Sequence, residues 1–281
     1  FYVVAYNGDS TLMAMSDQVN YLVTLPGEPK FNYIDYVSVD NDNNSVEINC
    51  LVDKDAIIDR YLIYRSLEDL NNFSEIGSVP FNNSSTINYM DYSANPDENF
   101  YQYQVFPVDT CNKILNAPSV YQSINDTSYG QTIFLQTEIN KDYGDDPQYF
   151  EQYTNTLNFN EYDKWLGEVV EYQLYRSVNR EDFDVLPLYI FDRVNNPDEE
   201  LKYIDIVTEF GDGNGRFCYY IKAIEGNNNP YGPVIEGSYS NISCVSQTPI
   251  LFVPSSFTPV SYTHLRAHET EADLVCRLLL E

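Results

Sequence analysis

A short segment occurs twice in the chain, and this repeat constrains the fold more than any other feature. Residues 61–66 read YLIYRS and residues 172–177 read YQLYRS. A Tyr-apolar-Asp step follows each copy, at residues 89–91 and 203–205. Self-similarity of this kind indicates that one supersecondary unit is used more than once. We therefore expect tandem domains that share one fold.

Each copy continues into a segment in which apolar and polar residues alternate, at residues 101–109 and 217–225. Tyr103 and Val105 align with Tyr219 and Ile221 in this register. A period of two places one side of a strand in a core and the other in water. Separators rich in Asn, Asp, Gly and Ser stand at residues 40–45, 82–85, 95–99, 211–215 and 227–232. Short strands at such spacing predict β-sandwiches of about a hundred residues.

The order of these segments resembles a known family of repeats. A Tyr-Arg-Ser strand, a Tyr-apolar-Asp step and a Tyr-x-apolar-x-Ala strand are similar to the fibronectin type III-like repeats of large exported Bacteroidetes proteins. Residues 155–167 and 45–50 are similar to the second-strand region of such repeats, with Cys50 where the family usually has Trp. The resemblance implies an all-β chain of tandem fibronectin type III, or immunoglobulin-like, β-sandwiches.

Residues 249–259, PILFVPSSFTP, carry a second resemblance. They look like the opening of a gliding-motility-associated C-terminal domain, which is the type B sorting signal of type IX secretion. An Asn-Gly-Asp-Gly segment should follow in that family, but the sequence continues differently from Val260. The resemblance implies a protein that is secreted or held at the outer-membrane cell surface.

The tail at residues 260–281 is similar to translated sequencing primers. Read back into codons, residues 261–270 resemble a transposase-type adapter, and residues 273–281 resemble a flow-cell primer region in the same frame. The alternative is an amphipathic helix, since Leu274 and Leu278 have helical spacing. Fusion segments are kept out of fold reasoning. Both histidines of the chain, His264 and His268, lie in this tail.

The predicted domain organisation has five parts. Phe1, Val3 and Ala5 fit the register of the repeated strand, so the chain is expected to open inside a further copy. The parts are a C-terminal remnant of a fibronectin type III-like domain at 1–28, two such domains at 29–127 and 128–249, the start of a truncated sorting domain at 250–259, and the adapter-like tail at 260–281.

Charge and hydropathy exclude two classes of partner. The net charge of −28 opposes binding to nucleic acid, which depends on Lys and Arg displacing counterions. The sequence contains no apolar run of the 18 or more residues that would predict a transmembrane helix. We expect no nucleic-acid partner and no transmembrane segment.

Candidate chemistry is sparse. A Ser-His-Asp or Cys-His arrangement needs a histidine, and none precedes the tail. Trp165 has two interpretations, as a packing residue or as a platform for a sugar ring, and its place in the repeat favours packing. Arg65 and Arg176 lie on otherwise apolar strands, where we expect buried stems and exposed heads. We predict no catalytic residue, no cofactor and no metal site.

Acidic loops match calcium sites only in part. Residues 40–44, DNDNN, begin like a calcium loop, but Ser45 replaces the glycine of the sharp turn and Leu51 replaces the closing Glu. A solvated hairpin turn is the favoured interpretation. The same alternatives, weak calcium binding or a solvated loop, hold for Asp142, Asp145, Asp146 and Asp212.

Cysteine usage agrees with export. Cys218 lies in a repeated strand and Cys244 in the strand that returns beside it. Neighbouring antiparallel strands bring Cα atoms within disulfide reach, and an oxidising compartment preserves the bond. We expect a structural disulfide between Cys218 and Cys244. Cys50 is expected to be a small buried residue, Cys111 lies in a loop, and their pairing stays open.

Two functional classes fit the sequence. In the first, the sandwiches are spacer or adhesion modules of a non-catalytic surface protein, related to gliding or attachment, whose ligand is a cell-surface polymer or a protein. In the second, they are accessory C-terminal domains of a large secreted enzyme, such as a polysaccharide hydrolase or a protease, whose catalytic domain lies upstream. In both, the chain itself is predicted not to be an enzyme.

Overall fold

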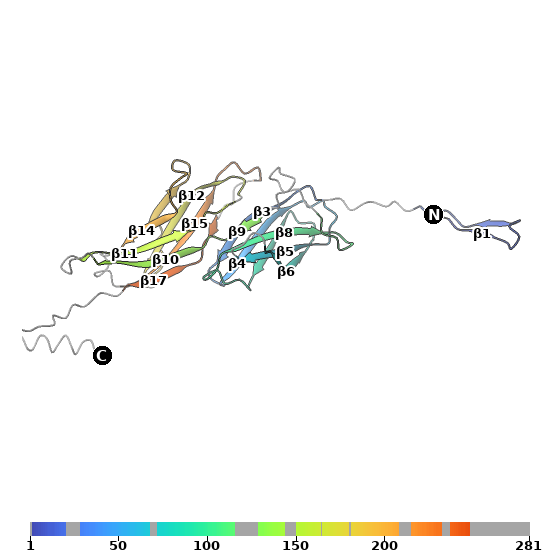
Figure 1. Cartoon of the computed structure of the whole chain (residues 1–281). Coiled ribbons are helices and arrows are strands. Elements are labelled where there is room, and N and C mark those ends of the chain that lie inside the picture. The colour runs from blue at the N-terminus through green and yellow to red at the C-terminus, as the bar shows by residue number, and fades with distance from the viewer. Residues whose placement is uncertain are drawn as a thin grey trace, which may run out of the picture. The chain divides into compact units, whose positions relative to one another are not determined.

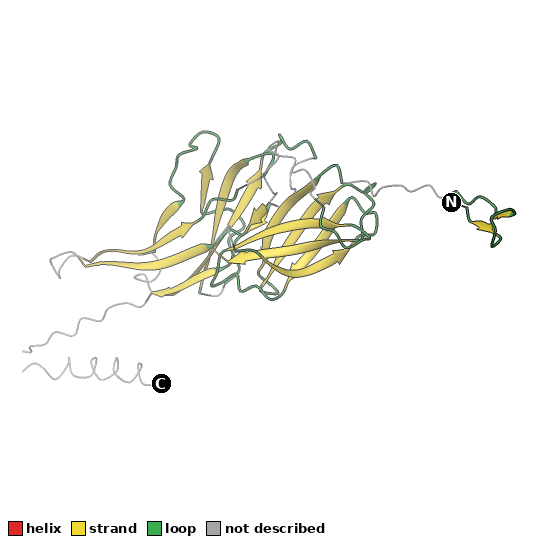
Figure 2. Ribbon diagram, turned by 45° about the vertical axis from the view of Figure 1, so that its right-hand side comes forward, coloured by secondary structure: helices red, strands yellow, loops and turns green. Residues whose placement is uncertain are grey.

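All regular structure in the described residues is antiparallel β-strand (Figure 2). The computed structural model describes residues 2–20, 29–67, 72–115, 129–143, 150–163, 165–179, 181–207, 215–231 and 237–247, all within one compact unit. Several predictions therefore fall outside the described residues, namely the sorting-domain segment at 250–259, the tail at 260–281 with His264 and His268, and Asp145, Asp146 and Asp212.

The first sandwich combines a three-stranded sheet with a four-stranded sheet (Figure 1). The first sheet has the order β3-β4-β7, with strands Asn32–Asp40, Ser45–Val52 and Thr86–Asp91. The second has the order β6-β5-β8-β9, with strands Ser74–Pro80, Arg60–Leu67, Tyr101–Val108 and Tyr129–Gln131. Alternate residues of β4, β5 and β8 form the core between the sheets, among them Val46, Ile48, Tyr61, Ile63 and Tyr103.

The second sandwich repeats this arrangement. Its three-stranded sheet has the order β10-β11-β14, with strands Leu135–Tyr143, Phe150–Phe159 and Lys202–Ile206. Its other sheet has the order β13-β12-β15-β16, with strands Tyr189–Asp192, Val169–Val178, Gly215–Glu225 and Ser238–Tyr239. A further strand, β17 at Ser243–Gln247, also pairs with β15. The core contains Leu157, Tyr172, Leu174, Phe191 and Tyr219.

The two sandwiches use the same strand order. In each, the first, second and fifth strands form one sheet, and the fourth, third, sixth and seventh form the other. The repeated hexapeptides form the equivalent strands β5 and β12, and Arg65 pairs with Tyr103 as Arg176 pairs with Tyr219. The prediction of an all-β chain of tandem fibronectin type III-like β-sandwiches is confirmed.

The strand pairing moves one domain boundary. A boundary between residues 127 and 128 assigns β9 to the second domain, but β9 pairs with β8 and so completes a sheet of the first sandwich. The first sandwich therefore extends to Gln131. A sequence argument misses this because β9 has only three residues, too few to show alternation.

The N-terminal residues form a separate hairpin of β1 (Val4–Tyr6) and β2 (Met13–Met15). Its large apolar side chains are exposed, among them Tyr2, Val3, Tyr6, Leu12 and Met13. The assignment of residues 1–28 to a remnant of another sandwich stays a prediction. Within the part of the chain that the structure describes, no helix has the length and hydropathy needed to cross a membrane.

Candidate functional site: the joint between the two sandwiches

The outer edge of β3 is covered by the second sandwich. The backbone N–H of Val37 donates to the hydroxyl of Tyr162 at 2.8 Å, and the carbonyl of Val37 accepts from the hydroxyl of Ser238 at 2.7 Å. The next residue of β3, Ser38, accepts from the backbone N–H of Tyr239 at 3.0 Å. Unpaired backbone groups at a sheet edge need partners, and here the second sandwich supplies them.

The loop between β11 and β12 forms the other half of the joint. The indole N–H of Trp165 donates to the carbonyl of Asp35 at 2.6 Å, and the backbone N–H of Leu166 donates to the hydroxyl of Tyr33 at 3.1 Å. Trp165 is 4% exposed and belongs to the core of the second sandwich. Trp165 is therefore a packing residue that also bonds to the first sandwich.

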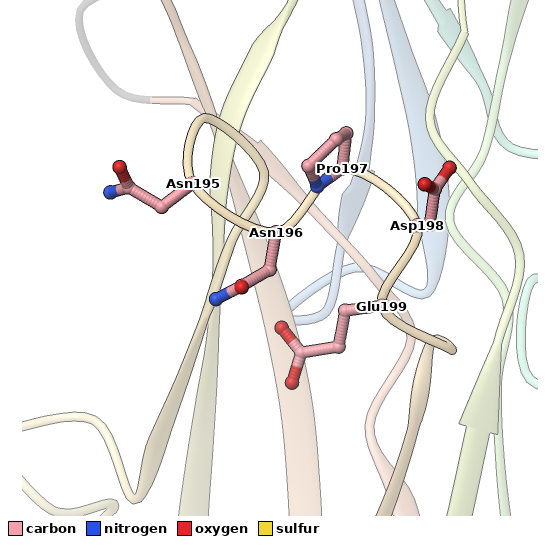
Figure 3. A pocket seen from close by; sticks show the side chains of 5 residues that line it. All are labelled: Asn195, Asn196, Pro197, Asp198 and Glu199. Atoms are coloured by element: carbon pink, nitrogen blue, oxygen red, sulfur yellow. The ribbon is translucent and has the colours of Figure 1, made fainter.

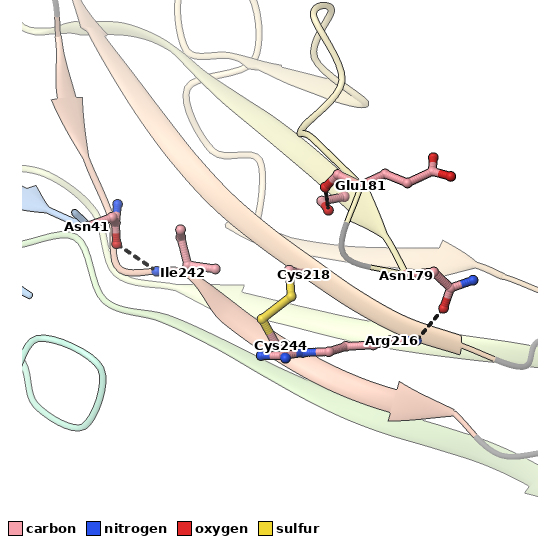
Figure 4. The surroundings of a disulfide bond; sticks show 8 residues. Asn41, Asn179, Glu181, Arg216, Cys218, Ile242 and Cys244 are labelled. Carbon is pink, nitrogen blue, oxygen red and sulfur yellow. Dashed lines mark hydrogen bonds between the residues drawn. A yellow bond between two sulfur atoms is a disulfide. The ribbon is translucent and has the colours of Figure 1, made fainter.

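Asn41 extends the joint beyond the end of β3. Its amide nitrogen donates to the carbonyl of Ser240 at 2.9 Å, and its amide oxygen accepts from the backbone N–H of Ile242 at 3.1 Å (Figure 4). On the opposite side, the Tyr231 ring stacks on Phe31 at 5.3 Å and on Tyr33 at 6.2 Å. The two sandwiches are thus joined by both polar and aromatic contacts.

An acidic pair lies in this joint. The register of β3 against β4 shifts between Ile34 and Tyr36, which makes Asp35 the extra residue of a β-bulge. Burial, and then the charge of Glu225, raise the pKa of Asp35 to about 6. Glu225 is itself 4% exposed and accepts from the backbone N–H of Gly167 at 3.0 Å and from the amide of Asn229 at 2.9 Å.

The two repeated arginines have structural partners. Arg65 donates to Asp91 at 2.7 Å, and Arg176 donates to both carboxylate oxygens of Asp205 at 2.8 and 2.9 Å. The same carboxylates accept from the equivalent tyrosines, at 3.0 Å from Tyr103 and at 2.7 Å from Tyr219. The expectation of exposed heads is wrong, because the guanidinium groups turn toward buried carboxylates that the repeated Tyr-apolar-Asp step supplies.

The structure links Cys218 and Cys244 by a disulfide with an S–S distance of 2.11 Å (Figure 4). The two residues lie directly opposite each other on β15 and β17. Cys50 and Cys111 are both free thiols, Cys50 buried in the first core and Cys111 exposed. Burial, and then the charge of Asp35, raise the pKa of the Cys50 thiol well above its usual range.

The acidic turns bond to themselves. In the turn after β3, Asp40 accepts from the backbone N–H groups of Asp42 at 3.1 Å and Asn43 at 3.2 Å, and from the Asn43 amide at 2.7 Å. These bonds, the Asn43 amide first, lower the pKa of Asp40. This geometry is a hairpin turn. The side chain of Asp142 lies outside the described residues.

A pocket follows β13 and is lined by residues of one turn, Asn195, Asn196, Pro197, Asp198 and Glu199 (Figure 3). Asp192 closes the start of this turn by accepting from the backbone N–H groups of Val194 and Asn195, each at 3.0 Å. Among the residues that the structure describes, no group of three His, Cys, Asp or Glu side chains is placed to hold a metal ion.

Sequence reasoning missed Asp35, Tyr162 and Glu225 as joint residues. Only the single Trp of the chain, Trp165, gave a local signal, and it indicated packing without indicating against what. The partner of Trp165 is 130 positions away in the sequence, so spacing alone could not identify it.

Comparisons with known proteins add little. No family model matches the sequence, and no curated protein matches it. Among solved structures, the chain is similar to the FN1–FN3 domains of chicken CNTN1, with 9% identity and a TM-score of 0.25, over 88% of this chain and 76% of that one. A TM-score this low carries no argument, so the fold assignment rests on the strand order described above.

Proposed function

We propose that this chain is a non-catalytic modular region of a secreted or cell-surface protein, in which the two sandwiches act as a stiff spacer or adhesion module. The observation that carries the proposal is the joint. Both backbone groups of Val37 and the carbonyl of Asp35 bond to the second sandwich, so rotation of one sandwich against the other would leave buried polar groups unpaired.

The connection between the sandwiches supports the same conclusion. Only residues 132–134 separate β9 from β10. At its end, the backbone N–H of Leu135 donates to the amide oxygen of Asn241 at 2.7 Å, and the Leu135 carbonyl accepts from the Asn241 amide at 3.1 Å. Domains on long linkers move freely, whereas a short bonded connection transmits position and force.

The location outside the cytoplasm is supported by the Cys218–Cys244 disulfide, since such bonds persist in oxidising compartments. The resemblance of residues 249–259 to a type IX sorting signal supports export by that route, and a role in gliding or attachment. The partner that we propose is a cell-surface polymer or a protein ligand.

The stiffness of the spacer is tested by a distance distribution between two spin labels. One label uses the exposed native thiol Cys111 in the first sandwich, and the other uses Val185→Cys, at a site that is 94% exposed in the second. Cys276→Ser removes the further thiol of the tail. We expect a single narrow distance distribution, which Trp165→Ala broadens. A broad distribution in the unmutated joint would contradict the spacer proposal.

The non-catalytic part needs its own assay. The purified chain is expected to release no product from polysaccharide or peptide substrates. Turnover that disappears when one carboxylate is changed to an amide would overturn this part and would leave the spacer proposal untouched.

A further inference from the structure

Two carboxylates that contribute nothing to either sandwich core meet at the joint. Asp35 bulges from β3, and Glu225 ends β15. We propose that ionisation of Asp35 controls how tightly the two sandwiches hold together, so that the joint opens more readily in neutral than in acidic solution. This goes beyond a spacer, because it makes the stiffness of the spacer depend on the medium.

The geometry keeps Asp35 within the joint. Its own carbonyl accepts from the indole of Trp165 at 2.6 Å, and the backbone two residues on, at Val37, bonds to Tyr162 at 2.8 Å. Tyr36, the next residue, packs against the core of the second sandwich. The side chain of Asp35 therefore cannot move far into water while these contacts hold, but it can do so when the joint opens.

The titratable groups around Asp35 come from three elements. Glu225 lies on β15, the Cys50 thiol on β4, and the Tyr162 hydroxyl on the loop between β11 and β12. On β3 itself, the Tyr36 hydroxyl donates to Glu47 at 3.1 Å. Burial raises the pKa values of both Cys50 and Tyr162, so these two groups stay neutral through the range in which Asp35 titrates. Glu225 remains as the neighbour whose charge opposes ionisation of Asp35.

The sign of the effect follows from linkage. Asp35 has a pKa of about 6 in the closed joint, against an ordinary value of 3.8 in water, so the closed joint binds the proton more tightly than the open one. The added stability of the joint is fully present below pH 3.8, falls as the pH rises, and is lost above about pH 6. A pKa difference of this size changes the opening constant by up to about a hundredfold.

Four backbone amides report on the joint alone, because each donates to an acceptor in the other sandwich. They belong to Val37, Leu166, Tyr239 and Ile242. Amide hydrogen exchange of the full chain, measured by NMR at pH 4.5 and pH 7.5 and corrected for intrinsic rates, gives their protection factors. We expect these four factors to fall at least about tenfold toward pH 7.5, while amides of the central strands β5 and β12 keep theirs.

Two variants and a control make the test specific. Asp35→Asn keeps position 35 neutral, so protection of the four amides should no longer depend on pH. Glu225→Gln keeps the oxygen that accepts from Gly167 and Asn229 but removes the charge, so the fall should shrink and move to lower pH. The control, Asp59→Asn, changes an aspartate on the surface whose side chain is 53% exposed, and should behave as the unmutated chain does.

The outcomes separate clearly. Protection of the four amides that is flat between the two pH values in the unmutated chain would overturn the proposal. So would an Asp35→Asn chain that retains the full pH dependence. Neither result would bear on whether the chain is a spacer, which the spin-label distances at a single pH decide.

Discussion

The two sandwiches share one buried ion pair but differ in what surrounds it. In the first, Arg65, Asp91 and Tyr103 form a set that Val46 closes, since Val46 lies opposite Asp91 on β4. Valine offers no polar group, so the hydrogen bonds cannot continue across that position. A repeated fold has therefore kept its central Arg-Asp-Tyr set in an apolar setting here.

In the second sandwich, Asn155 takes the place of Val46 and lies opposite Asp205. Its amide donates to the hydroxyl of Tyr219 at 2.7 Å, and its oxygen accepts from the amide of Gln247 at 2.9 Å. The chain of hydrogen bonds thus runs from β12 through the core to β17. The Cys218–Cys244 disulfide ties the same strand, β17, to β15. The second sandwich holds its last strand by two devices that the first one lacks at the equivalent positions.

The largest difference between the sandwiches is expected from removing the carboxylate of the ion pair. Asp205→Ala leaves Arg176 buried without its partner, and Arg176 is only 13% exposed. Breaking a buried pair in this way lowers the free energy of unfolding by about 3–5 kcal/mol. Asp91→Ala should fall at the lower end of that range, because the Arg65 side chain is 22% exposed and keeps more contact with water.

Urea unfolding measures both losses in the full chain. Trp165 is the only tryptophan and lies in the second core, so its fluorescence follows the second sandwich, while far-ultraviolet circular dichroism follows both. The matched control is Asp59→Ala, which removes an exposed partner of Arg60 and should change stability by less than about 0.5 kcal/mol. A larger loss at Asp91 than at Asp205 would break the comparison.

The disulfide gives the next largest expected effect, and only in the second sandwich. Cys218 and Cys244 are 26 positions apart, and closing a loop of that length stabilises a fold by about 3–4 kcal/mol in the chain-entropy model. Replacing both cysteines by serine should lower the urea midpoint of the fluorescence transition. A reducing agent should do the same to the unmutated chain and should leave the double variant unchanged. A fluorescence midpoint that resists both treatments would remove the disulfide from the comparison.

Much of the fold could be predicted because the sequence repeats its own strands. The hexapeptide at residues 61–66 carries the alternation that buries Tyr61 and Ile63, and the copy at 172–177 buries Tyr172 and Leu174 in the same way. Local pattern and turn chemistry suffice for such strands, because their periodicity is set by one face of a sheet. Short strands such as β9 and β16 carry too few residues for this argument.

The joint could not be predicted, for a physical reason. Asp35 looks like any polar residue of a strand, and its importance comes from a bulge and from Glu225, which is 190 positions away. The interpretation of Arg65 and Arg176 failed in the same manner. A sequence shows that an arginine stem can be buried, but whether its head meets water or a carboxylate depends on packing between sheets.

The smallest expected effect comes from exchanging the residues at which the two sandwiches differ, Val46 and Asn155. Asn155→Val should cost less than about 1 kcal/mol, because Tyr219 still donates to Asp205 and Gln247 still donates to the carbonyl of Thr154 at 3.1 Å.

The reverse change, Val46→Asn, should cost more, about 1–3 kcal/mol. The new amide can donate to Tyr103 as Asn155 donates to Tyr219, but its oxygen gains no counterpart of Gln247, since the last strand of the first sandwich, β9, ends at Gln131, whose amide donates to the carbonyl of Glu161. Urea unfolding followed by far-ultraviolet circular dichroism measures Val46→Asn, and fluorescence measures Asn155→Val. Equal losses at the two positions would mean that the longer network adds no specificity, and that the sandwiches differ only in the disulfide.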